Sequence, residues 1–197
     1  RASQERWPQL DPQVPQNAGF LKHIDHFDPA FFGVSQLEAR GMDPQQRILL
    51  MLAWECLENA GLNPENLRGK RVGVFIGLSS ADYAQTQIRQ LEQVNTYTIT
   101  GLAASTCANR ISYFFDFKGP SLIVDTACSS SLSALHLARQ SLGQGEIDLA
   151  LVGGANILLS PLIQSAFDAA SALSPDGLCR PFDAEANGIA RGEGAGM

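Results

Sequence analysis

The residue with the clearest capacity for chemistry is Cys128, which lies between an apolar run at residues 121–124 and the serines at 129–131. The apolar run predicts a buried strand, and the periodic segment that ends at Gly143 predicts a helix. Cys128 is therefore expected at or beside the N-terminus of that helix. The free amides and positive dipole end of a helix favour a thiolate, the nucleophilic form of cysteine, and the same amides can donate to a developing oxyanion.

The local pattern also allows a second interpretation of Cys128, as a small buried residue without chemistry, which is the commoner fate of a lone cysteine. The helix that follows carries apolar residues mainly on one face, namely Leu132, Leu135, Leu137, Ala138 and Leu142. This pattern supports the helix but does not decide between the two interpretations of the thiol.

The other cysteines show no pattern of a metal or disulfide site. Cys56 and Cys107 fall on the apolar faces of two predicted helices, where a place in the core explains them. Together with Cys128 and Cys179 they are widely spaced and form no CxxC pair. The sequence therefore suggests neither a zinc site nor a disulfide framework, although an even number of cysteines does not by itself exclude a disulfide.

The remaining candidate ligands are two histidines and two carboxylates. The spacing of His23 and His26 would bring them near each other on a helix, but no third ligand or carboxylate pattern accompanies them. We interpret them as surface or structural residues. Asp183 and Glu185 are close enough in sequence to form a carboxylate pair, but solvated loop charges are the simpler explanation. We expect no metal ion.

Two further apolar segments predict the strands that would position Cys128. Residues 71–77 indicate a central strand buried on both faces, and residues 147–155 indicate another strand. Strand, helix and strand in this order predict a right-handed crossover in a parallel sheet, and hence an α/β fold. Such sheets bind ligands at the carboxyl ends of their strands, which is where Cys128 would lie.

Further helices are predicted at residues 43–60, 100–116 and 160–173. The first has the strongest start signals. Asp43 can cap it, Pro44 fits its first position, and Gln46 can reach back as a capping-box residue.

The remaining segments are less regular. An aromatic-rich loop with a short helix is expected within residues 19–33, and the pattern at 82–94 fits either a helix or a loop. The proline-containing opening, residues 1–17, is expected to be an irregular surface segment. Residues 180–197 alternate charge with glycine and are expected to form a loop before a strand.

Composition indicates a folded protein with one sizeable core. The chain has 197 residues, of which 45% are hydrophobic, and a formal net charge of −6. No lysine- or arginine-rich run is present, which argues against nucleic acid as a partner. No apolar stretch approaches the roughly 20 residues that span a bilayer, and the first residues lack an apolar signal core. A cytoplasmic location without membrane association is therefore expected.

Four sequence stretches together match one enzyme family. They are residues 43–47 (DPQQR), 125–132 (DTACSSSL), 180–183 (RPFD) and 191–196 (RGEGAG). Their residues and order resemble those of β-ketoacyl synthases, and over nearly all of its length the chain resembles a ketosynthase domain of a modular, type I polyketide synthase. The stretch around Cys128 is the most specific of the four.

The resemblance implies a thiolase-like fold, layered αβαβα when complete and usually dimeric. This chain, residues 1–197, would be a partial ketosynthase domain that covers most of the N-terminal half without its first strand. In that family the cysteine takes an acyl chain from an acyl carrier protein, and a malonyl-type extender on a carrier protein then loses carbon dioxide and condenses with it in a Claisen reaction. The resemblance thus implies an acyltransferase in which Cys128 is the nucleophile and its own amide is one oxyanion donor.

The same resemblance implies partners but no cofactor. The phosphopantetheine arm belongs to the carrier protein, so neither a metal nor an organic cofactor is expected. The acyltransferase and other domains of a polyketide synthase are the expected partners, along with a second copy of the domain.

The chain departs from the family pattern in one important respect. Ketosynthases also need two histidines, in glycine-rich motifs that lie beyond the region corresponding to Met197, and His23, His26 and His136 match neither motif. We therefore expect that this chain alone does not condense substrates. Two alternatives stay open: a non-elongating ketosynthase that passes acyl chains on without condensation, and a structural half-domain that is inactive without the missing histidines.

Overall fold

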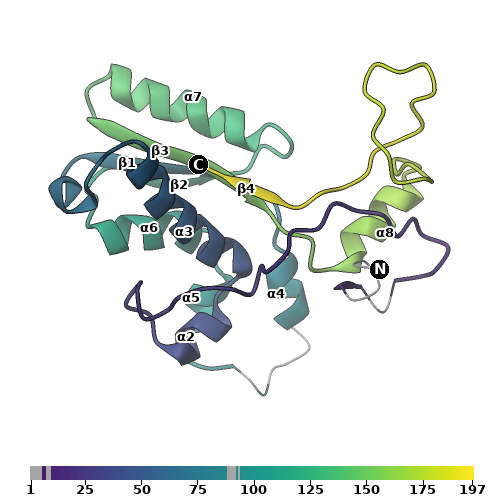
Figure 1. Cartoon of the computed structure of the whole chain (residues 1–197), viewed down its shortest axis with the longest axis horizontal. Helices are drawn as coiled ribbons and strands as arrows, with labels where there is room; N and C mark the ends of the chain where they lie inside the picture. The colour runs from purple at the N-terminus through teal and green to yellow at the C-terminus, as the bar shows by residue number, and fades with distance from the viewer. Residues whose placement is uncertain (1–5, 8–9, 88–91, 93) are drawn as a thin grey trace.

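A computed structural model describes residues 6–7, 10–87, 92 and 94–197. Within these residues four strands form one sheet in the order β2-β1-β3-β4. The strands are β1 (Val72–Gly77), β2 (Ser121–Val124), β3 (Leu149–Asn156) and β4 (Gly194–Gly196). The architecture is a mixed α/β sheet covered by helices (Figure 1), which confirms the predicted α/β class.

The central strand is β1, and all six of its residues are buried, as its apolar sequence predicts. It pairs in parallel with β2 on one side, where Gly77 lies opposite Val124, and with β3 on the other, where Gly77 lies opposite Gly154. The carboxyl ends of the three strands therefore meet at one edge of the sheet. The short strand β4 pairs antiparallel with β3 and lies within residues 180–197, which were expected to be a loop before a strand.

Helices cover both faces of the sheet. The helix α7 (Ser130–Gly143) packs on one face, and α3 (Pro44–Asn59) and α6 (Thr106–Phe115) pack on the other (Figure 1). Side chains along β1 alternate between these layers. Val74 and Ile76 belong to the large apolar core shared with α3 and α6, whereas Phe75 packs with Ala134 of α7.

The start of α3 follows its sequence signals in part. The Asp43 side chain accepts a hydrogen bond from Gln45 N at 2.8 Å, and Pro44 opens the helix. The capping-box role predicted for Gln46 is wrong. Its buried side-chain amide donates instead to the carbonyl oxygens of Thr100 and Gly101, at 3.0 and 2.9 Å.

This contact also explains why the helix predicted at residues 100–116 is two helices. The chain forms α5 (Thr98–Leu102) and then α6, with a break between them. Gln46 occupies the carbonyl oxygens of Thr100 and Gly101, which a continuous helix would use for its own hydrogen bonds. The break is therefore set by a residue more than fifty positions away in the sequence.

Four other expectations need correction. The strand predicted at residues 121–124 was expected to be buried, but no residue of β2 is buried and Leu122 is exposed. The helix predicted to reach residue 173 is α8 (Pro161–Ala169) and ends earlier. The segment 19–33 forms turns but no helix, although its aromatic residues do pack onto the body, as in the edge-to-face contact of Phe31 with Trp54. The described residues of the opening segment, 6–7 and 10–17, are not a surface segment throughout, because Trp7, Leu10 and Val14 are buried against Leu158 and Leu173 in a second small core.

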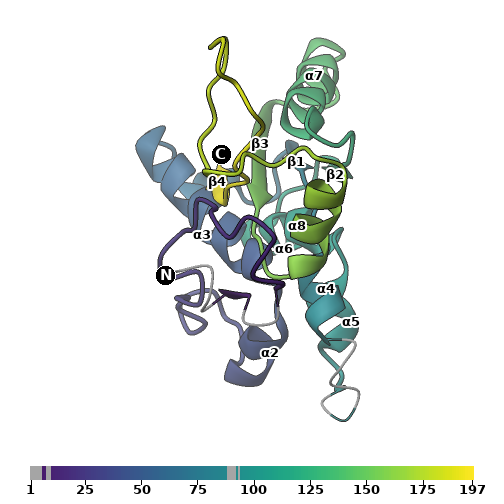
Figure 2. The same cartoon turned by 90° about the vertical axis from the view of Figure 1, so that its right-hand side faces the viewer.

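The remaining elements are short, and they are α2 (Gln36–Gly41), η1 (Pro64–Leu67) and α4 (Asp82–Gln87). The helix α4 occupies part of the segment whose pattern fits either a helix or a loop, and residues 88–91 and 93 of that segment lie outside the described residues. Figure 2 shows the loop between α8 and β4 extending away from the body. No helix in the described part of the chain is both long enough and apolar enough to cross a membrane.

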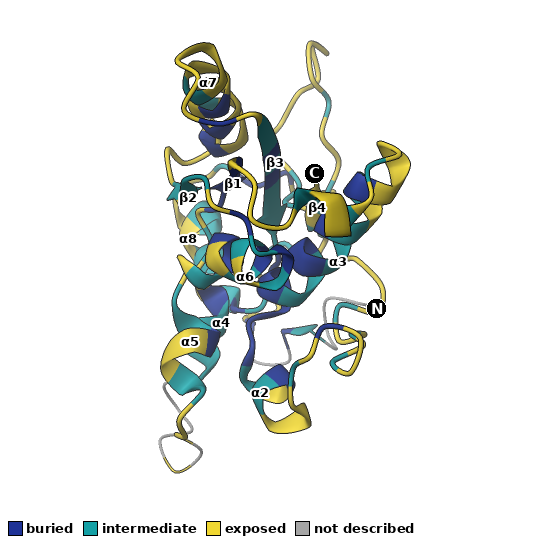
Figure 3. Cartoon of the chain, turned by 90° about the vertical axis from the view of Figure 1, so that its left-hand side faces the viewer, coloured by how far each residue is buried: buried dark blue, intermediate teal, exposed yellow. Residues whose placement is uncertain are grey.

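The helix α7 is buried on a face made of small residues. Its buried residues are Ser130, Ala134 and Ala138, which let the helix lie close to the sheet. The larger side chains of Leu132 and Leu135 are 73% and 53% exposed. Figure 3 shows this outward face of α7 open to solvent.

Candidate active site

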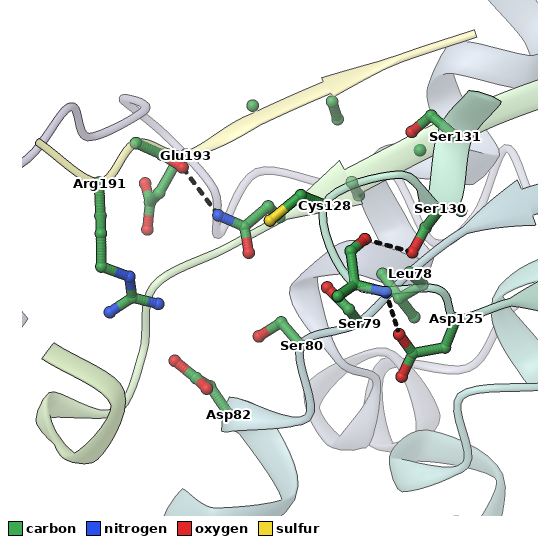
Figure 4. A pocket seen from close by; sticks show the side chains of 18 of the residues that line it. Leu78, Ser79, Ser80, Asp82, Asp125, Cys128, Ser130, Ser131, Arg191 and Glu193 are labelled. Atoms are coloured by element: carbon green, nitrogen blue, oxygen red, sulfur yellow. Dashed lines mark hydrogen bonds between the residues drawn. The ribbon is translucent and has the colours of Figure 1, made fainter. Parts of the chain in front are cut away.

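Cys128 lies between the end of β2 and the start of α7, one residue before the N-cap Ser129. This position confirms the prediction that the cysteine lies beside a helix N-terminus. The thiol is exposed and lines a cleft (Figure 4). The alternative interpretation of Cys128 as a small buried residue is therefore wrong.

A tight bend presents Cys128 to the cleft. The residue before it, Ala127, has φ of +56°, a left-handed conformation that costs a residue with a Cβ roughly 1–2 kcal/mol. Two side chains hold this bend (Figure 4). Asp125 Oδ1 accepts a hydrogen bond from Ala127 N at 3.0 Å, and Ser130 Oγ donates to Ala127 O at 2.5 Å. Ser130 Oγ also accepts from Thr126 N at 3.0 Å, so one buried hydroxyl bridges both sides of the bend.

Two strand glycines let the first turn of α7 approach the sheet. A Cβ placed on Gly77 would lie 2.5 Å from Ser131 N and 2.7 Å from the carbonyl carbon of Ser130. A Cβ on Gly154 would lie 2.5 Å from Ser131 Oγ. Contacts this short do not occur. At Gly77 the contacts are with helix backbone, so only glycine there permits the observed position of the helix and of Cys128 beside it, whereas at Gly154 the close contact is with the Ser131 hydroxyl.

The cleft has a volume of about 1010 Å³ and opens at the carboxyl ends of β1 and β3. Its other walls come from the segment after β1, from α8 and from residues 191–196. This location is the one predicted from the strand-helix-strand order. No histidine is among the described residues that line it, so His23, His26 and His136 lie outside the cleft.

The carboxylates at the cleft are engaged in structural contacts. Asp82 Oδ2 accepts from Leu159 N and Ser160 N at 3.1 and 3.0 Å, which fixes the loop before α8. The side chain of Glu193 is fully buried and accepts from Leu158 N at 3.0 Å. Both carboxylates therefore hold the wall of the cleft.

Glu193 also joins segments from three parts of the chain. It accepts from Leu21 N at 2.8 Å and forms an ion pair with Arg6, also at 2.8 Å. The residue matched a family motif in the sequence, but no local signal indicated that it would be buried, because its partners lie far from it along the chain.

Arg191 supplies a positive charge at the wall of the cleft, where it is half-buried. Its guanidinium stacks over the Phe167 ring at 5.3 Å from the centroid. Burial lowers the pKa of Arg191, and the nearby Asp82 carboxylate opposes that shift. Sequence reasoning assigned no role to either side chain.

The other candidate residues lie away from the cleft. Cys107 is buried, as predicted, and burial raises the pKa of its thiol to about 12. Cys56 is half-buried on α3, and Cys179 is exposed. Asp183 and Glu185 are both exposed, as expected for solvated loop charges.

Comparison with known proteins identifies the family of this chain. The family described as "Beta-ketoacyl synthase, N-terminal domain" matches residues 2–197. The chain is 46% identical over 203 residues to the polyketide synthase ThaG of Burkholderia thailandensis, covering 98% of this chain and 4% of that protein. It is 46% identical over 202 residues to the 6-methylsalicylic acid synthase of Aspergillus niger, covering 98% of this chain and 11% of that protein.

A solved structure agrees with these relatives. The ketosynthase from module 6 of the bacillaene synthase of Bacillus subtilis 168 superposes with a TM-score of 0.84 at 42% identity, covering 97% of this chain and 32% of that one. The chain thus spans a small part of its curated relatives and about a third of a solved ketosynthase. By sequence and by its thiolase-like fold, the chain belongs to the β-ketoacyl synthases and forms an N-terminal part of a ketosynthase domain of the polyketide synthase type.

Proposed function

We propose that Cys128 is the nucleophile that accepts an acyl chain in a polyketide β-ketoacyl synthase. One observation carries this proposal: an exposed thiol lies beside the N-terminus of α7, in a cleft at the carboxyl ends of β1 and β3. A helix N-terminus stabilises the negative charge of a thiolate, and its amides can stabilise an oxyanion. The two glycines beneath the helix give this position a structural cause.

The proposed first step is a transfer between thioesters. The Cys128 thiolate attacks the thioester carbonyl of an acyl carrier protein, and a carbon–sulfur bond forms as the carbonyl becomes an oxyanion. The Cys128 amide is one donor to that oxygen. The intermediate then expels the phosphopantetheine thiolate, which takes up a proton. The acyl group is now attached to Cys128, and no metal or organic cofactor takes part.

The second step is a decarboxylative condensation in the complete domain. A malonyl-type extender on an acyl carrier protein loses carbon dioxide, and the electron pair left behind forms an enolate. The enolate carbon attacks the acyl-Cys128 carbonyl, and the Cys128 thiolate leaves. The two histidines that the resemblance implies for this step are not in this chain, and no histidine among the described residues lines the cleft. We propose that the domain works as a homodimer in the cytoplasm, beside the acyltransferase and other domains of a polyketide synthase.

Acylation of the isolated chain tests the first step. The purified chain is incubated with a small acyl thioester, and its intact mass is measured with the Cys128→Ala variant beside it. We expect one acyl adduct, absent in Cys128→Ala. The Cys179→Ala variant is the matched control, because it removes the other exposed thiol and should leave the adduct intact.

Two other outcomes decide against parts of the proposal. An adduct that persists in Cys128→Ala would overturn the assignment of the nucleophile. A folded wild-type chain that forms no adduct would favour the structural half-domain. Measuring release of carbon dioxide and a condensed product from the complete domain then separates condensation from acyl transfer alone.

A further inference from the structure

The two histidines near the start of the chain lie together in a turn that the sequence pattern did not reveal. His26 N donates to His23 O at 3.0 Å, which closes a four-residue turn, and His23 has φ of +60°. The two imidazole rings stack with their centroids 4.4 Å apart. Neither residue lines the cleft at Cys128, so this turn is separate from the proposed acyl-transfer site.

Asp25 supplies the third ligand that was missing from the sequence pattern. One potential ligand atom from each of His23, Asp25 and His26 lies within 4.8 Å of the others, and all three residues are exposed. Zinc binds nitrogen and oxygen atoms at about 2.0–2.2 Å, so two ligand atoms of a tetrahedral zinc site lie roughly 3.4 Å from each other. The exposed side chains must rotate to close this difference when an ion binds, and water can take the remaining position.

The backbone that carries these side chains is held on both sides. Before the turn, Leu21 N donates to the buried Glu193 carboxylate at 2.8 Å. After it, the Phe27 ring stacks on Phe32, with centroids 5.2 Å apart, against the main core. Arg47 of α3 donates to the backbone oxygen of Asp25 at 3.4 Å. The turn is thus anchored before any ion binds, which reduces the entropy lost on binding.

We propose that His23, Asp25 and His26 form a surface site for a divalent transition metal ion of the zinc type. Imidazole nitrogens suit zinc, copper and nickel, whereas magnesium and calcium require mainly oxygen ligands. The positive charge of Arg47 beside Asp25 disfavours an ion held by charge alone. The site therefore depends on coordinate bonds from the two imidazoles and selects zinc over magnesium.

Zinc titration of the untagged chain tests this site. Calorimetry should show one zinc ion bound by the wild type and no binding of magnesium. Each of His23→Ala and His26→Ala should weaken zinc binding by at least about tenfold. Removing a residue that only hydrogen-bonds to a metal ligand already weakens metal binding by about that much, and removing the ligand itself should weaken it at least as much. His136→Ala is the matched control, since this exposed histidine lies on α7 and should leave the affinity unchanged.

Thermal unfolding gives a second measurement. Zinc should raise the unfolding temperature of the wild type and of His136→Ala but not of the His23→Ala/His26→Ala double variant, because only an ion bound to the folded state stabilises it. Without zinc the double variant should unfold like the wild type, since both side chains are exposed. Equal zinc affinity in the double variant and the wild type would overturn the proposal, as would an absence of zinc binding by the folded wild type.

Discussion

At the scale of single residues, the proposed chemistry depends on how the chain bends before α7. Cys128 is presented by Ala127 in a left-handed conformation, and that conformation is held by Asp125 and Ser130. The Ser130 hydroxyl is buried and satisfies two backbone groups at once. The thiol position is thus maintained by hydrogen bonds that never touch the sulfur.

We predict that Ser130→Ala both destabilises the chain and slows modification of Cys128. It leaves Thr126 N without its partner, which costs about 1–3 kcal/mol of unfolding free energy. Ala127 O loses its bond from the hydroxyl but keeps the one from Ser130 N. Urea unfolding measures the first effect, and the rate of alkylation by iodoacetamide measures the second. Ser141→Ala, near the other end of α7, should change stability by less than about 0.5 kcal/mol. Alkylation of Ser130→Ala at the wild-type rate would show that this hydroxyl does not position the thiol.

The sequence predicts the place of Cys128 but not the way it is held. An apolar run followed by small residues and a helical period is a local signal, and it placed the thiol correctly beside α7. The left-handed φ of Ala127 has no such signal, because alanine rarely adopts it and the hydrogen bonds that enforce it appear only in the folded bend. For the same reason Asp25 was not recognised beside His23 and His26, which form a turn and not a helix.

At the scale of elements, the contact between α7 and the sheet decides where the cleft forms. Small residues on the helix, Ala134 and Ala138, meet the sheet over its length. At its first turn the helix meets the backbone of Gly77 and Gly154. A side chain at Gly77 would push the helix away and move Cys128 with it, whereas a side chain at Gly154 would first displace the Ser131 hydroxyl.

We predict that Gly77→Ala destabilises the chain by about 1–3 kcal/mol, the usual cost of overpacking. The added methyl group would meet backbone atoms of Ser130 and Ser131, which cannot move without shifting the helix start. Slower alkylation of Cys128 should accompany the loss of stability.

Gly143→Ala is the matched control, because a Cβ there meets nothing within 4 Å. Alanine is also the better helix former at this last residue of α7, so stability should stay the same or rise. If Gly77→Ala unfolded at the same urea concentration as the wild type, the close approach of α7 would not be required for stability.

The strands were predictable because apolar runs of this length bounded by turns are local features. The predicted strands at 71–77 and 147–155 correspond to β1 and β3. Helix ends were predicted less well. The break between α5 and α6 depends on the Gln46 amide reaching across from α3, and such a contact leaves no mark in the periodicity of residues 100–116.

At the scale of the whole molecule, the outward face of α7 is apolar and uncovered. Leu132, Leu135, Leu137 and Leu142 are all exposed. The helical period indicates that Leu132, Leu135 and Leu142 share a face, with Leu137 on the opposite flank of the helix. It does not indicate that the face is open, because what covers a helix depends on the rest of the fold. The solved bacillaene ketosynthase is longer, with this chain covering 32% of it.

We predict that the isolated chain self-associates through this face. Contiguous exposed apolar surface drives association in water. The Leu132→Gln/Leu135→Gln double variant should sediment as a smaller species than the wild type at the same concentration. Leu37→Gln, on α2 and similarly exposed, is the control and should not change the sedimentation. A wild type that sediments as a monomer, or a double variant as large as the wild type, would contradict the prediction.

The contacts of Glu193 also affect when the protein can fold. Arg6 and Leu21 bind a carboxylate near the other end of the chain, and Gly19 exchanges backbone hydrogen bonds with Arg191 and Glu193. While the chain is still being made on a ribosome, Arg6, Gly19 and Leu21 have no partner at this site until residues 191–193 have been made. The sheet strands β1 to β3 and α7 can assemble earlier during synthesis. The small core around Trp7 can close only after translation has passed Leu173, and the Glu193 contacts only after residue 193.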